Sequence, residues 1–354
     1  MVPAPSQLVH LVRGFVKRES VNVKNFDMPW SRRLWLYRHG FASSRGELYD
    51  ISPDNVDAYL SDADWTKTRH VVKPYESGLM VKPLFHRLLS ETHAHLLPDA
   101  YGIISDGTIA QPTGFDGDLA DIDDLLALAR RQPLVIKPVD GLMGKDVHVL
   151  GSDEGALTVD GAATRPTEAR ELLADVPESI IVEYVQQAGY ASDIYPKTPN
   201  TIRLLTMVDP DDDEPFLAAA VHRFGTAQSE PVDNASAGGV FAGIDRETGT
   251  FKEVVTPAES GAVNRFTEHP DTGVTITGQT VPGWERITEQ VLDLTAEFGW
   301  MWPCVGWDVI ATDEGGTLSI IEGNERSAVD FHQTYEPLLA DDRVRRFYEH
   351  HGVI

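Results

Sequence analysis

Cysteine, long apolar runs and basic residues are all scarce in this sequence of 354 residues. Cys304 is the only cysteine, so no disulfide can form within the chain. No apolar run approaches the ~20 residues that a membrane-spanning helix needs. The first six residues also lack the cationic start of a signal peptide. We therefore expect a cytoplasmic protein without membrane insertion.

The shortage of basic residues leaves a large excess of negative charge. Lys and Arg number 30 against 55 Asp and Glu, which gives a formal net charge of −25. A surface of this sign repels the phosphates of nucleic acids and of anionic membranes, which argues against both as partners. The acidic residues are spread along the chain, and this predicts a folded protein of a salt-adapted, halophilic cytoplasm. An ordinary acidic cytosolic protein is the alternative.

The apolar pattern predicts an α+β fold with a sizeable core. Helices are predicted at 81–95, 121–131, 167–174, 282–298 and 341–350. Strands are predicted at 134–137, 147–150, 179–185, 201–208, 216–224, 240–244, 251–255, 305–312 and 317–322. Residues 1–80 are predicted to be helical and irregular. Their aromatic side chains are expected to pack on a neighbouring domain, namely Trp30, Trp35, Tyr37, Phe41, Tyr49, Tyr59 and Trp65.

Acidic residues lie on both arms of a predicted hairpin at 306–324. Glu322 and Asn324 point to one face because strand side chains alternate. A three-residue turn at 314–316 would place Asp308 opposite Glu322, whereas an even-numbered turn would place it on the other face. If the three side chains converge, two carboxylates and an amide oxygen suit Mg²⁺. An exposed polar strand face is the alternative.

A second group of residues could surround phosphate. Lys137 ends an apolar strand and is followed by Gly141, Gly144 and Lys145. One fixed charge and the backbone N–H groups of a glycine-rich loop can hold phosphate oxygens. Neither the P-loop pattern nor the Rossmann glycine pattern is present. A plain hairpin turn would explain the segment about as well.

Two arginines lie in otherwise apolar strands, Arg203 at 201–208 and Arg223 at 216–224. Each needs an anionic partner, either from the protein or from a ligand. The segment 232–239 predicts a mobile loop that leads into the next strand. The strand that starts at 179 turns polar at its end, where backbone groups can meet an adenine edge, although an ordinary core strand is the simpler interpretation.

In this order, the segments resemble the ATP-grasp superfamily and, within it, the sugar-transfer-associated ATP-grasp family, which is related to α-L-glutamate ligases. The resemblance covers roughly Lys82 to the C-terminus. Seven motifs carry it: Val81–His86, Ile136–Pro138, Val182–Tyr184, Asn200–Arg203, Val232–Asn234 with Gly238 and Gly239, Gly306–Asp308, and Ile321–Asn324. It implies two α+β subdomains that grip ATP, at 81–190 and 191–354, after a mostly helical region at 1–80.

The resemblance also implies how ATP and metal are held. Lys82 and Lys137 would bind phosphates under a lid that contains Gly141, Gly144 and Lys145. Glu183, Tyr184 and Val185 would form the adenine hinge, and Asp193 is a candidate for the ribose. Asp308, Glu322 and Asn324 would hold one or two Mg²⁺ ions, with Mn²⁺ as a substitute. Arg203 or Arg223 would neutralise the γ-phosphate, and Asn234 is a further candidate catalytic residue.

The implied reaction is an ADP-forming ligation. A substrate carboxylate attacks the γ-phosphate to give an acylphosphate, and an amine or other nucleophile then displaces phosphate, possible substrates being cell-surface glycans or peptide-like metabolites. A kinase acting on a hydroxyl and a nucleotide-binding regulator without turnover are the alternatives. The partners are therefore expected to be small molecules.

Overall fold

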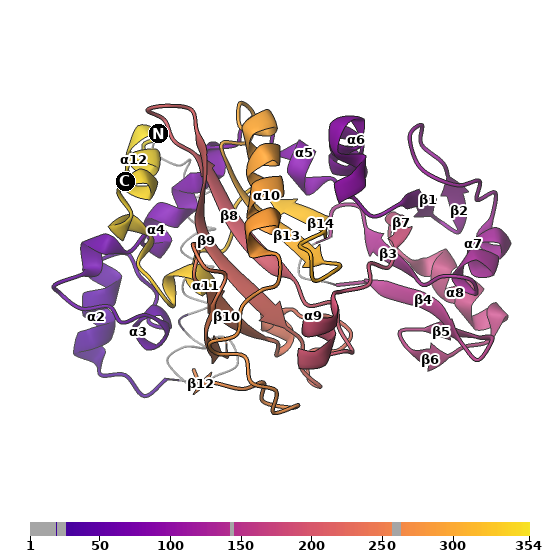
Figure 1. The fold of residues 1–354 in the computed structure, drawn as a ribbon, viewed down its shortest axis with the longest axis horizontal. Coiled ribbons are helices and arrows are strands. Elements are labelled where there is room, and N and C mark those ends of the chain that lie inside the picture. The colour runs from indigo at the N-terminus through magenta and orange to yellow at the C-terminus, as the bar shows by residue number, and fades with distance from the viewer. Residues whose placement is uncertain (1–18, 20–25, 142–144, 257–262) are drawn as a thin grey trace.

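Two seven-stranded antiparallel sheets dominate the computed structural model of the chain, which describes residues 19, 26–141, 145–256 and 263–354. Figure 1 shows the first sheet at one end of the molecule, the second sheet near the middle and the first helices of the chain at the other end. The expected α+β class is confirmed. Among the described residues, no helix has the length and apolar character to cross a membrane.

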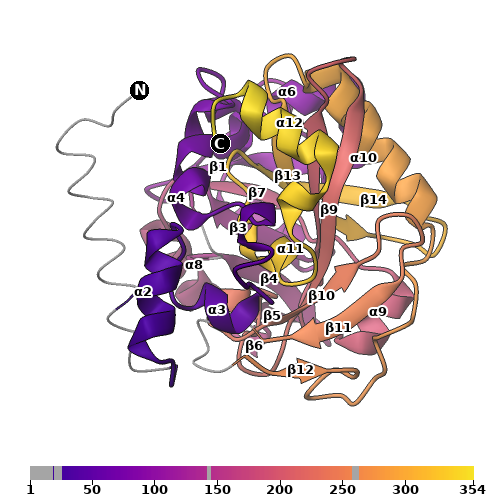
Figure 2. The same ribbon diagram turned by 90° about the vertical axis from the view of Figure 1, so that its left-hand side faces the viewer.

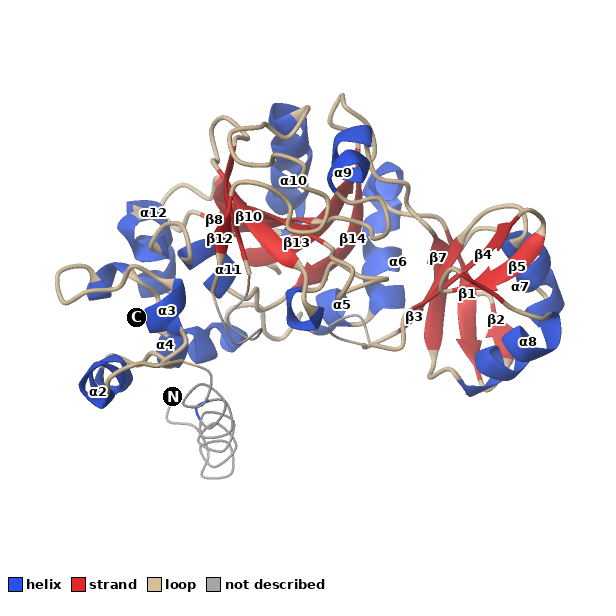
Figure 3. Ribbon diagram, turned by 90° about the horizontal axis from the view of Figure 1, so that it is seen from below, coloured by secondary structure: helices blue, strands red, loops and turns tan. Residues whose placement is uncertain are grey.

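The first sheet has the strand order β2-β1-β7-β3-β4-β5-β6. Its strands are β1 (Ala100–Ser105), β2 (Thr108–Ala110), β3 (Leu134–Pro138), β4 (His148–Asp153), β5 (Ala156–Val159), β6 (Ala162–Ala163) and β7 (Ser179–Glu183). Helices α7 (Ile122–Ala129) and α8 (Pro166–Asp175) lie beside it, as Figure 3 shows. Leu125 of α7 and Leu173 of α8 pack with Ile136 of β3 in one apolar cluster, which stabilises this layer.

The second sheet has the order β12-β11-β10-β9-β8-β13-β14. Its strands are β8 (Ile202–Val208), β9 (Pro215–Phe224), β10 (Val240–Ile244), β11 (Phe251–Val255), β12 (Arg265–Phe266), β13 (Cys304–Ala311) and β14 (Leu318–Asn324). The long helix α10 (Trp284–Phe298) covers one face through Ile287, Val291 and Leu294. The other face therefore remains for the site and for the terminal helices (Figure 2).

Shorter helices complete the described chain. They are α2 (Trp30–Arg38), α3 (Arg45–Leu48), α4 (Asp62–Trp65), α5 (Ser77–Met80), α6 (Lys82–His93), α9 (Gly189–Ile194), α11 (Asp330–Gln333) and α12 (Asp342–His350), with 3₁₀ turns at Val56–Ala58, Thr66–His70, Ala94–Leu96, Ala235–Ala237 and Leu338–Ala340. The boundary predicted at residue 190 falls inside α9. The division into three regions stays a prediction.

The N-terminal region packs mainly on the second sheet. Phe41, Tyr49 and Tyr59 are buried in a cluster with Phe241 of β10, as expected for aromatic anchors. Trp30 departs from that prediction, because 62% of it is exposed on the outer face of α2. Sequence alone did not separate it from the anchors, since all are aromatic.

Several small elements escaped the sequence analysis. Strand β1 contains Gly102, β2 has only three residues, and α9 and α11 are a turn or two long. Such short segments are too brief to show a periodic apolar pattern. The conformation of these segments depends on the elements that they contact in the folded chain, as when β1 pairs with β7.

Candidate active site

A cavity of about 540 Å³ lies between the two sheets and takes its walls from both. The first sheet contributes aliphatic side chains, Val135, Val149 and Val182. The second sheet contributes charged and polar side chains, Arg203, Arg223, Asp308, Glu322 and Asn324. One end of the cavity therefore suits an apolar ring system, and the other suits a charged group.

The chain beyond β7 forms one edge of the apolar end. Glu183, Tyr184 and Val185 all line the cavity. The amide of Glu183 donates to Asp99 O at 2.9 Å, and that of Tyr184 donates to Pro133 O at 3.1 Å. Within the described part of the chain, the amide of Val185 has no such acceptor. An unpaired backbone donor beside an aliphatic wall can bind a ring nitrogen of a purine.

The hairpin β13–β14 brings Asp308 opposite Glu322, but by a route other than a three-residue turn. Thr312 N donates to Thr317 O at 2.8 Å, so four residues, 313–316, form the loop. That even-numbered loop alone would put Asp308 on the wrong face. The register shifts between Asp308 and Val309, where Ile321 is the extra residue of a β-bulge, and this shift restores the pairing.

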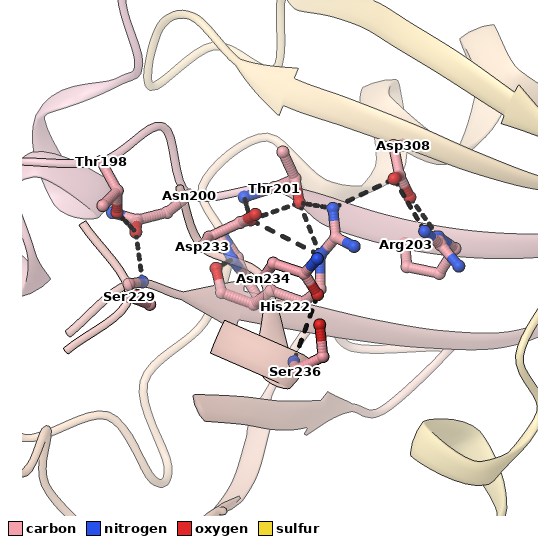
Figure 4. A network of polar contacts seen from close by, with 12 residues as sticks. Thr198, Asn200, Thr201, Arg203, His222, Ser229, Asp233, Asn234, Ser236 and Asp308 are labelled. Carbon is pink, nitrogen blue, oxygen red and sulfur yellow. Dashed lines mark hydrogen bonds and ion pairs between the residues drawn. The ribbon is translucent and has the colours of Figure 1, made fainter. Parts of the chain in front are cut away.

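Asp308 is buried between two arginines. Arg203 donates to both of its carboxylate oxygens, with Nη2 at 2.7 Å from Oδ2, and Arg223 Nη2 lies 3.0 Å from the same Oδ2. Figure 4 shows Asp308 facing Arg203 across the strands. Burial alone would raise the pKa of the Asp308 carboxyl, but Arg203 and Arg223 hold it well below its usual value. The anionic partner that the arginines required is thus a residue of the protein.

Glu322 and Asn324 complete a set of oxygen donors beside Asp308. Burial and the Asp308 charge raise the pKa of Glu322, so the two carboxylates repel each other. The Nδ2 group of Asn324 donates a hydrogen bond to Gly306 O at 3.1 Å. The amide oxygen of Asn324 therefore points away from Gly306 O. The described residues contain no cluster of three or more His, Cys, Asp or Glu suited to a metal. Two carboxylates and one amide oxygen could hold a cation, which would relieve the repulsion between the carboxylates.

Two lysines approach this charged end from the other side. Lys137 is 8% exposed, and its Nζ donates to Ile321 O at 3.2 Å. Lys82, at the start of α6, donates to Gly141 O at 2.8 Å. Burial, and then the Lys82 charge, lower the pKa of Lys137 to about 8. Burial also lowers the pKa of Lys82, so both ammonium groups lack full compensation.

The loop after β3 is described only in part. Gly141 and the exposed Lys145 line the cavity, whereas Gly144 lies outside the described residues. A Cβ on Gly141 would come within 2.8 Å of Pro138 Cβ, so the turn favours glycine there. The proposed lid residues thus flank the cavity where the structure describes them.

The segment after β9 holds Arg223 through an acid that the sequence analysis did not select. Asp233 is 6% exposed and accepts bonds from Thr201 N at 2.8 Å and Thr201 Oγ1 at 2.5 Å. Its Oδ2 lies 3.5 Å from Arg223 Nε. Asn234 lines the cavity but caps a 3₁₀ turn by accepting from Ser236 N at 3.2 Å (Figure 4). Asp233 lies within the motif at 232–234 that carried the resemblance, and this was the available signal for it.

Asp193 does not reach the cavity. It is exposed on α9 and is not among the cavity-lining residues. The short helix that carries it begins at Gly189 and turns this side chain to solvent. The structure therefore does not bring Asp193 together with the other predicted site residues, and its role as the ribose acid stays a prediction. Cys304 also lies away from the cavity, packed against the cluster beneath α12, and desolvation raises the pKa of its thiol to about 12.

Two antiparallel sheets that enclose lysines, arginines and paired carboxylates define the ATP-grasp fold. The family described as sugar-transfer associated ATP-grasp matches residues 72–344, and the chain belongs to it. The expected family and fold are confirmed. No curated protein matches the chain by sequence.

Solved structures similar to the chain are distant. D-cycloserine synthetase is 16% identical, with 76% of this chain and 72% of that one covered and a TM-score of 0.37. D-alanine–D-alanine ligase from Bacillus anthracis is 12% identical, with 78% and 69% covered and a TM-score of 0.36. An ADP complex of N5-carboxyaminoimidazole ribonucleotide synthetase is 14% identical, with 72% and 46% covered and a TM-score of 0.38. The match thus spans less than half of this last protein.

Proposed function

We propose that the protein is an ATP- and Mg²⁺-dependent ligase that activates a carboxylate as an acylphosphate and joins it to an amine or another nucleophile. The observation that carries this is the division of one cavity into an aliphatic end and a charged end. Membership of the ATP-grasp family supports ATP as the occupant. The substrates would be small molecules, of the kind found in cell-surface glycans or peptide-like metabolites.

The aliphatic end would hold the adenine. Val135, Val149 and Val182 would contact the faces of the ring, and the free amide of Val185 would bind one ring nitrogen. Contact with the apolar surface would supply affinity for the ring without fixing its direction, whereas the hydrogen bond from the Val185 amide would fix the orientation of the adenine. The phosphates would then point toward the second sheet.

The charged end would hold the triphosphate. Lys82 and Lys137 would pair with phosphate oxygens, which would compensate the two poorly solvated ammonium groups. Asp308, Glu322 and Asn324 would hold Mg²⁺, which when bound supplies charge neutralisation to the phosphates. Arg223, whose side chain is 13% exposed, would stabilise the negative charge of the transferring phosphoryl group.

The reaction would proceed in two balanced steps. A carboxylate oxygen forms a bond to the γ-phosphorus while the bond to the β–γ bridging oxygen breaks, and ADP leaves. The amine nitrogen then bonds to the acyl carbon, phosphate leaves with the acyl-bound oxygen, and the nitrogen loses a proton. Water must stay out between the steps, and a cavity enclosed by two sheets favours this.

Trapping the acylphosphate tests the proposal. Candidate carboxylates are screened with ATP, Mg²⁺ and hydroxylamine, and ADP and hydroxamate are measured together. A ligase gives hydroxamate in proportion to ADP, whereas a hydroxyl kinase gives a stable phosphate ester and no hydroxamate. ATP binding without either product, with every carboxylate and hydroxyl class tried, would favour a nucleotide-binding regulator and contradict the proposal.

A further inference from the structure

The segment after hairpin β13–β14 contains buried polar groups that the proposed mechanism does not use. Four of the eight buried side-chain atoms that lack a hydrogen-bond partner in the described chain lie in residues 327–332, namely Ser327 Oγ, Asp330 Oδ1 and both ring nitrogens of His332. Buried polar atoms are nearly always paired, so such a cluster needs an explanation. A ligand that brings hydrogen-bond donors to this segment would supply one.

Helix α11, which carries Asp330, lies beside the charged end of the cavity. It packs on β9 and β10, as Figure 2 shows. The ring of Phe331 lies 4.7 Å from that of Phe241, and Phe241 faces Arg223 in the register of β10 with β9. Asp330 and Phe331 also line the cavity. Because Arg223 is assigned to the transferring phosphoryl group, α11 borders the place where the nucleophile must arrive.

Asp330 shares one arginine with a second carboxylate. Arg45 Nη1 lies 2.8 Å from Asp330 Oδ2, and Arg45 Nη2 lies 2.9 Å from Asp62 Oδ1. Asp62 accepts further bonds from Arg45 Nε at 3.0 Å and from Ala42 N at 2.9 Å. Asp330 Oδ1, by contrast, has no partner in the described chain. One guanidinium thus faces two largely buried carboxylates, which leaves one negative charge in excess on the side of Asp330.

Asp330 is also the cavity carboxylate that has no other task. Five carboxylates of the described chain line the cavity. Asp308 and Glu322 are assigned to Mg²⁺, Asp233 pairs with an arginine of β9, and Glu183 is exposed at the adenine hinge. Asp330, which is 9% exposed, remains for the second substrate.

We infer that Asp330 binds the ammonium group of an amine substrate and accepts its proton, so that the nucleophile of the ligase is an amine. This inference rests on the proposed acylphosphate mechanism and names the class of nucleophile. An ammonium ion would bring N–H donors to the unpaired oxygen and a positive charge to the carboxylate in excess. A carboxylate substrate would be repelled at this position, and a hydroxyl group would bring no charge.

The proton transfer makes the amine reactive. An amine is mostly protonated near neutral pH and has no lone pair for attack until a proton leaves. One N–H bond of the ammonium breaks, the proton moves to Asp330, and the lone pair of nitrogen bonds to the acyl carbon. The bond from the acyl carbon to the phosphate oxygen breaks, and phosphate leaves with the bonding electrons and takes a second proton from nitrogen. Asp330 then releases its proton to solvent.

Two nucleophiles of equal size test the inference on the full chain. Methylamine is an ammonium ion near neutral pH, whereas hydroxylamine is largely uncharged and needs no base. Both are supplied with ATP, Mg²⁺ and a carboxylate that gives hydroxamate. Asp330→Asn should lower the rate of methylamide formation by about 10²-fold or more, as expected for a lost general base, and should change the hydroxamate rate little. The loss should shrink as the pH rises, because free methylamine then becomes abundant.

Asp62→Asn is the matched control, because Asp62 binds the same guanidinium but is not among the described residues that line the cavity. Its ratio of methylamide to hydroxamate should equal that of the wild type. If Asp330→Asn does not fold, Asp330→Glu keeps the charge and displaces it by one methylene. Its KM for methylamine should then rise while hydroxamate formation is unchanged.

The ratio of the two products separates a catalytic role from a structural one. A ratio in Asp330→Asn equal to that of the wild type, whether both rates persist or fall together, would overturn the inference and leave Asp330 as a support for Arg45. An unchanged KM for methylamine in Asp330→Glu, or an equal fall of the ratio in Asp62→Asn, would overturn it too. A wild type that forms no hydroxamate with any carboxylate would contradict the proposed function itself, and the inference with it.

Discussion

The two walls of the cavity differ in what stabilises them when no ligand is bound. On the first sheet, the wall consists of Val135, Val149 and Val182, and burial of their apolar surface favours the folded state by itself. On the second sheet, Arg203 and Asp308 are buried but charged. Removing two charges from water costs free energy that their mutual attraction only partly returns.

This difference distinguishes residues that stabilise the fold from residues that serve a ligand. Aliphatic side chains of this kind pack in any well-packed sheet, whereas the four cations and two carboxylates at the charged end, which include Lys137 of the first sheet and Lys82 of α6, cost free energy to remove from water. The cations are only partly neutralised, because burial lowers the pKa of both Lys82 and Lys137. A multiply charged ligand at this wall would supply the missing compensation.

The largest effect should come from removing one oxygen donor at the charged wall. Glu322→Ala should lower Mg²⁺-dependent ADP production by roughly 10²-fold or more, since several kcal/mol of charge stabilisation depend on the metal. The fold should survive, because a repelling carboxylate is removed. Glu289→Ala, on the exposed side of α10, is the control and should keep full turnover. Equal Mg²⁺-dependent rates for Glu322→Ala and wild type would sink the metal assignment.

Among the stability effects, the largest should follow the loss of the Asp308 charge, which pairs with Arg203 and Arg223. Asp308→Asn leaves Arg203 without a carboxylate, so the free energy of unfolding should fall by about 3–5 kcal/mol. Urea denaturation measures this loss. Glu336→Gln, which breaks the pair with Lys252 where Glu336 is 63% exposed, should cost no more than about 1 kcal/mol. Similar losses for both variants would contradict the view that burial sets the two walls apart.

Lys137 should affect both the affinity for ATP and the pH dependence of stability. Lys137→Ala should weaken ATP binding by roughly 1.5–3 kcal/mol, the value of a charge-assisted contact. Because the pKa of Lys137 is about 8 in the folded protein and about 10.4 in the unfolded chain, the unfolded state binds more protons between these values. Stability should therefore rise across that window in the wild type, and Lys137→Met should remove this part of the rise. If calorimetry gives Lys137→Ala the same ATP affinity as the wild type, the assignment of Lys137 to a phosphate is refuted.

Salt should act on the surface and spare the charged wall. The 55 acidic residues exceed the 30 Lys and Arg by 25, so one-to-one pairing would leave 25 of them without a basic partner. The Debye length falls from about 30 Å at 0.01 M to about 3 Å at 1 M, so repulsion should be screened and the melting temperature should rise with KCl. Asp308→Asn should lower stability at both salt concentrations, because its partners are buried. Equal midpoints for the wild type at low and molar KCl would mean that the acidity is incidental.

The smallest effect is expected at Asp193, which the structure leaves outside both walls. Asp193→Ala should bind ATP as the wild type does, because its side chain is exposed on α9. Titration of the variant and the wild type under identical conditions compares the two. A clear loss of affinity in Asp193→Ala would show that α9 approaches the nucleotide when ATP is bound, which the present arrangement does not predict.

Local pattern was sufficient for much of the fold. Strands β10 and β11 were predicted with their observed bounds because each is a short run rich in apolar residues. Helix α10 was predicted within two residues because its apolar periodicity extends over 15 residues. The order of the seven motifs was sufficient to identify the family, although each motif by itself is unspecific. These features are properties of contiguous segments, and each segment can be recognised from its own residues alone.

Tertiary structure decided which charges meet. Asp308 faces Glu322 only because a bulge at Ile321 compensates a four-residue turn, and nothing in the residue types marks that bulge. Arg203 meets Asp308 across 105 positions of sequence, and Asp233 lies beside Arg223. The sequence determined which residues could do the chemistry, because composition and periodicity act locally. Only the register of distant strands decided which of them came within bonding distance, because one residue of shift turns a side chain to the opposite face.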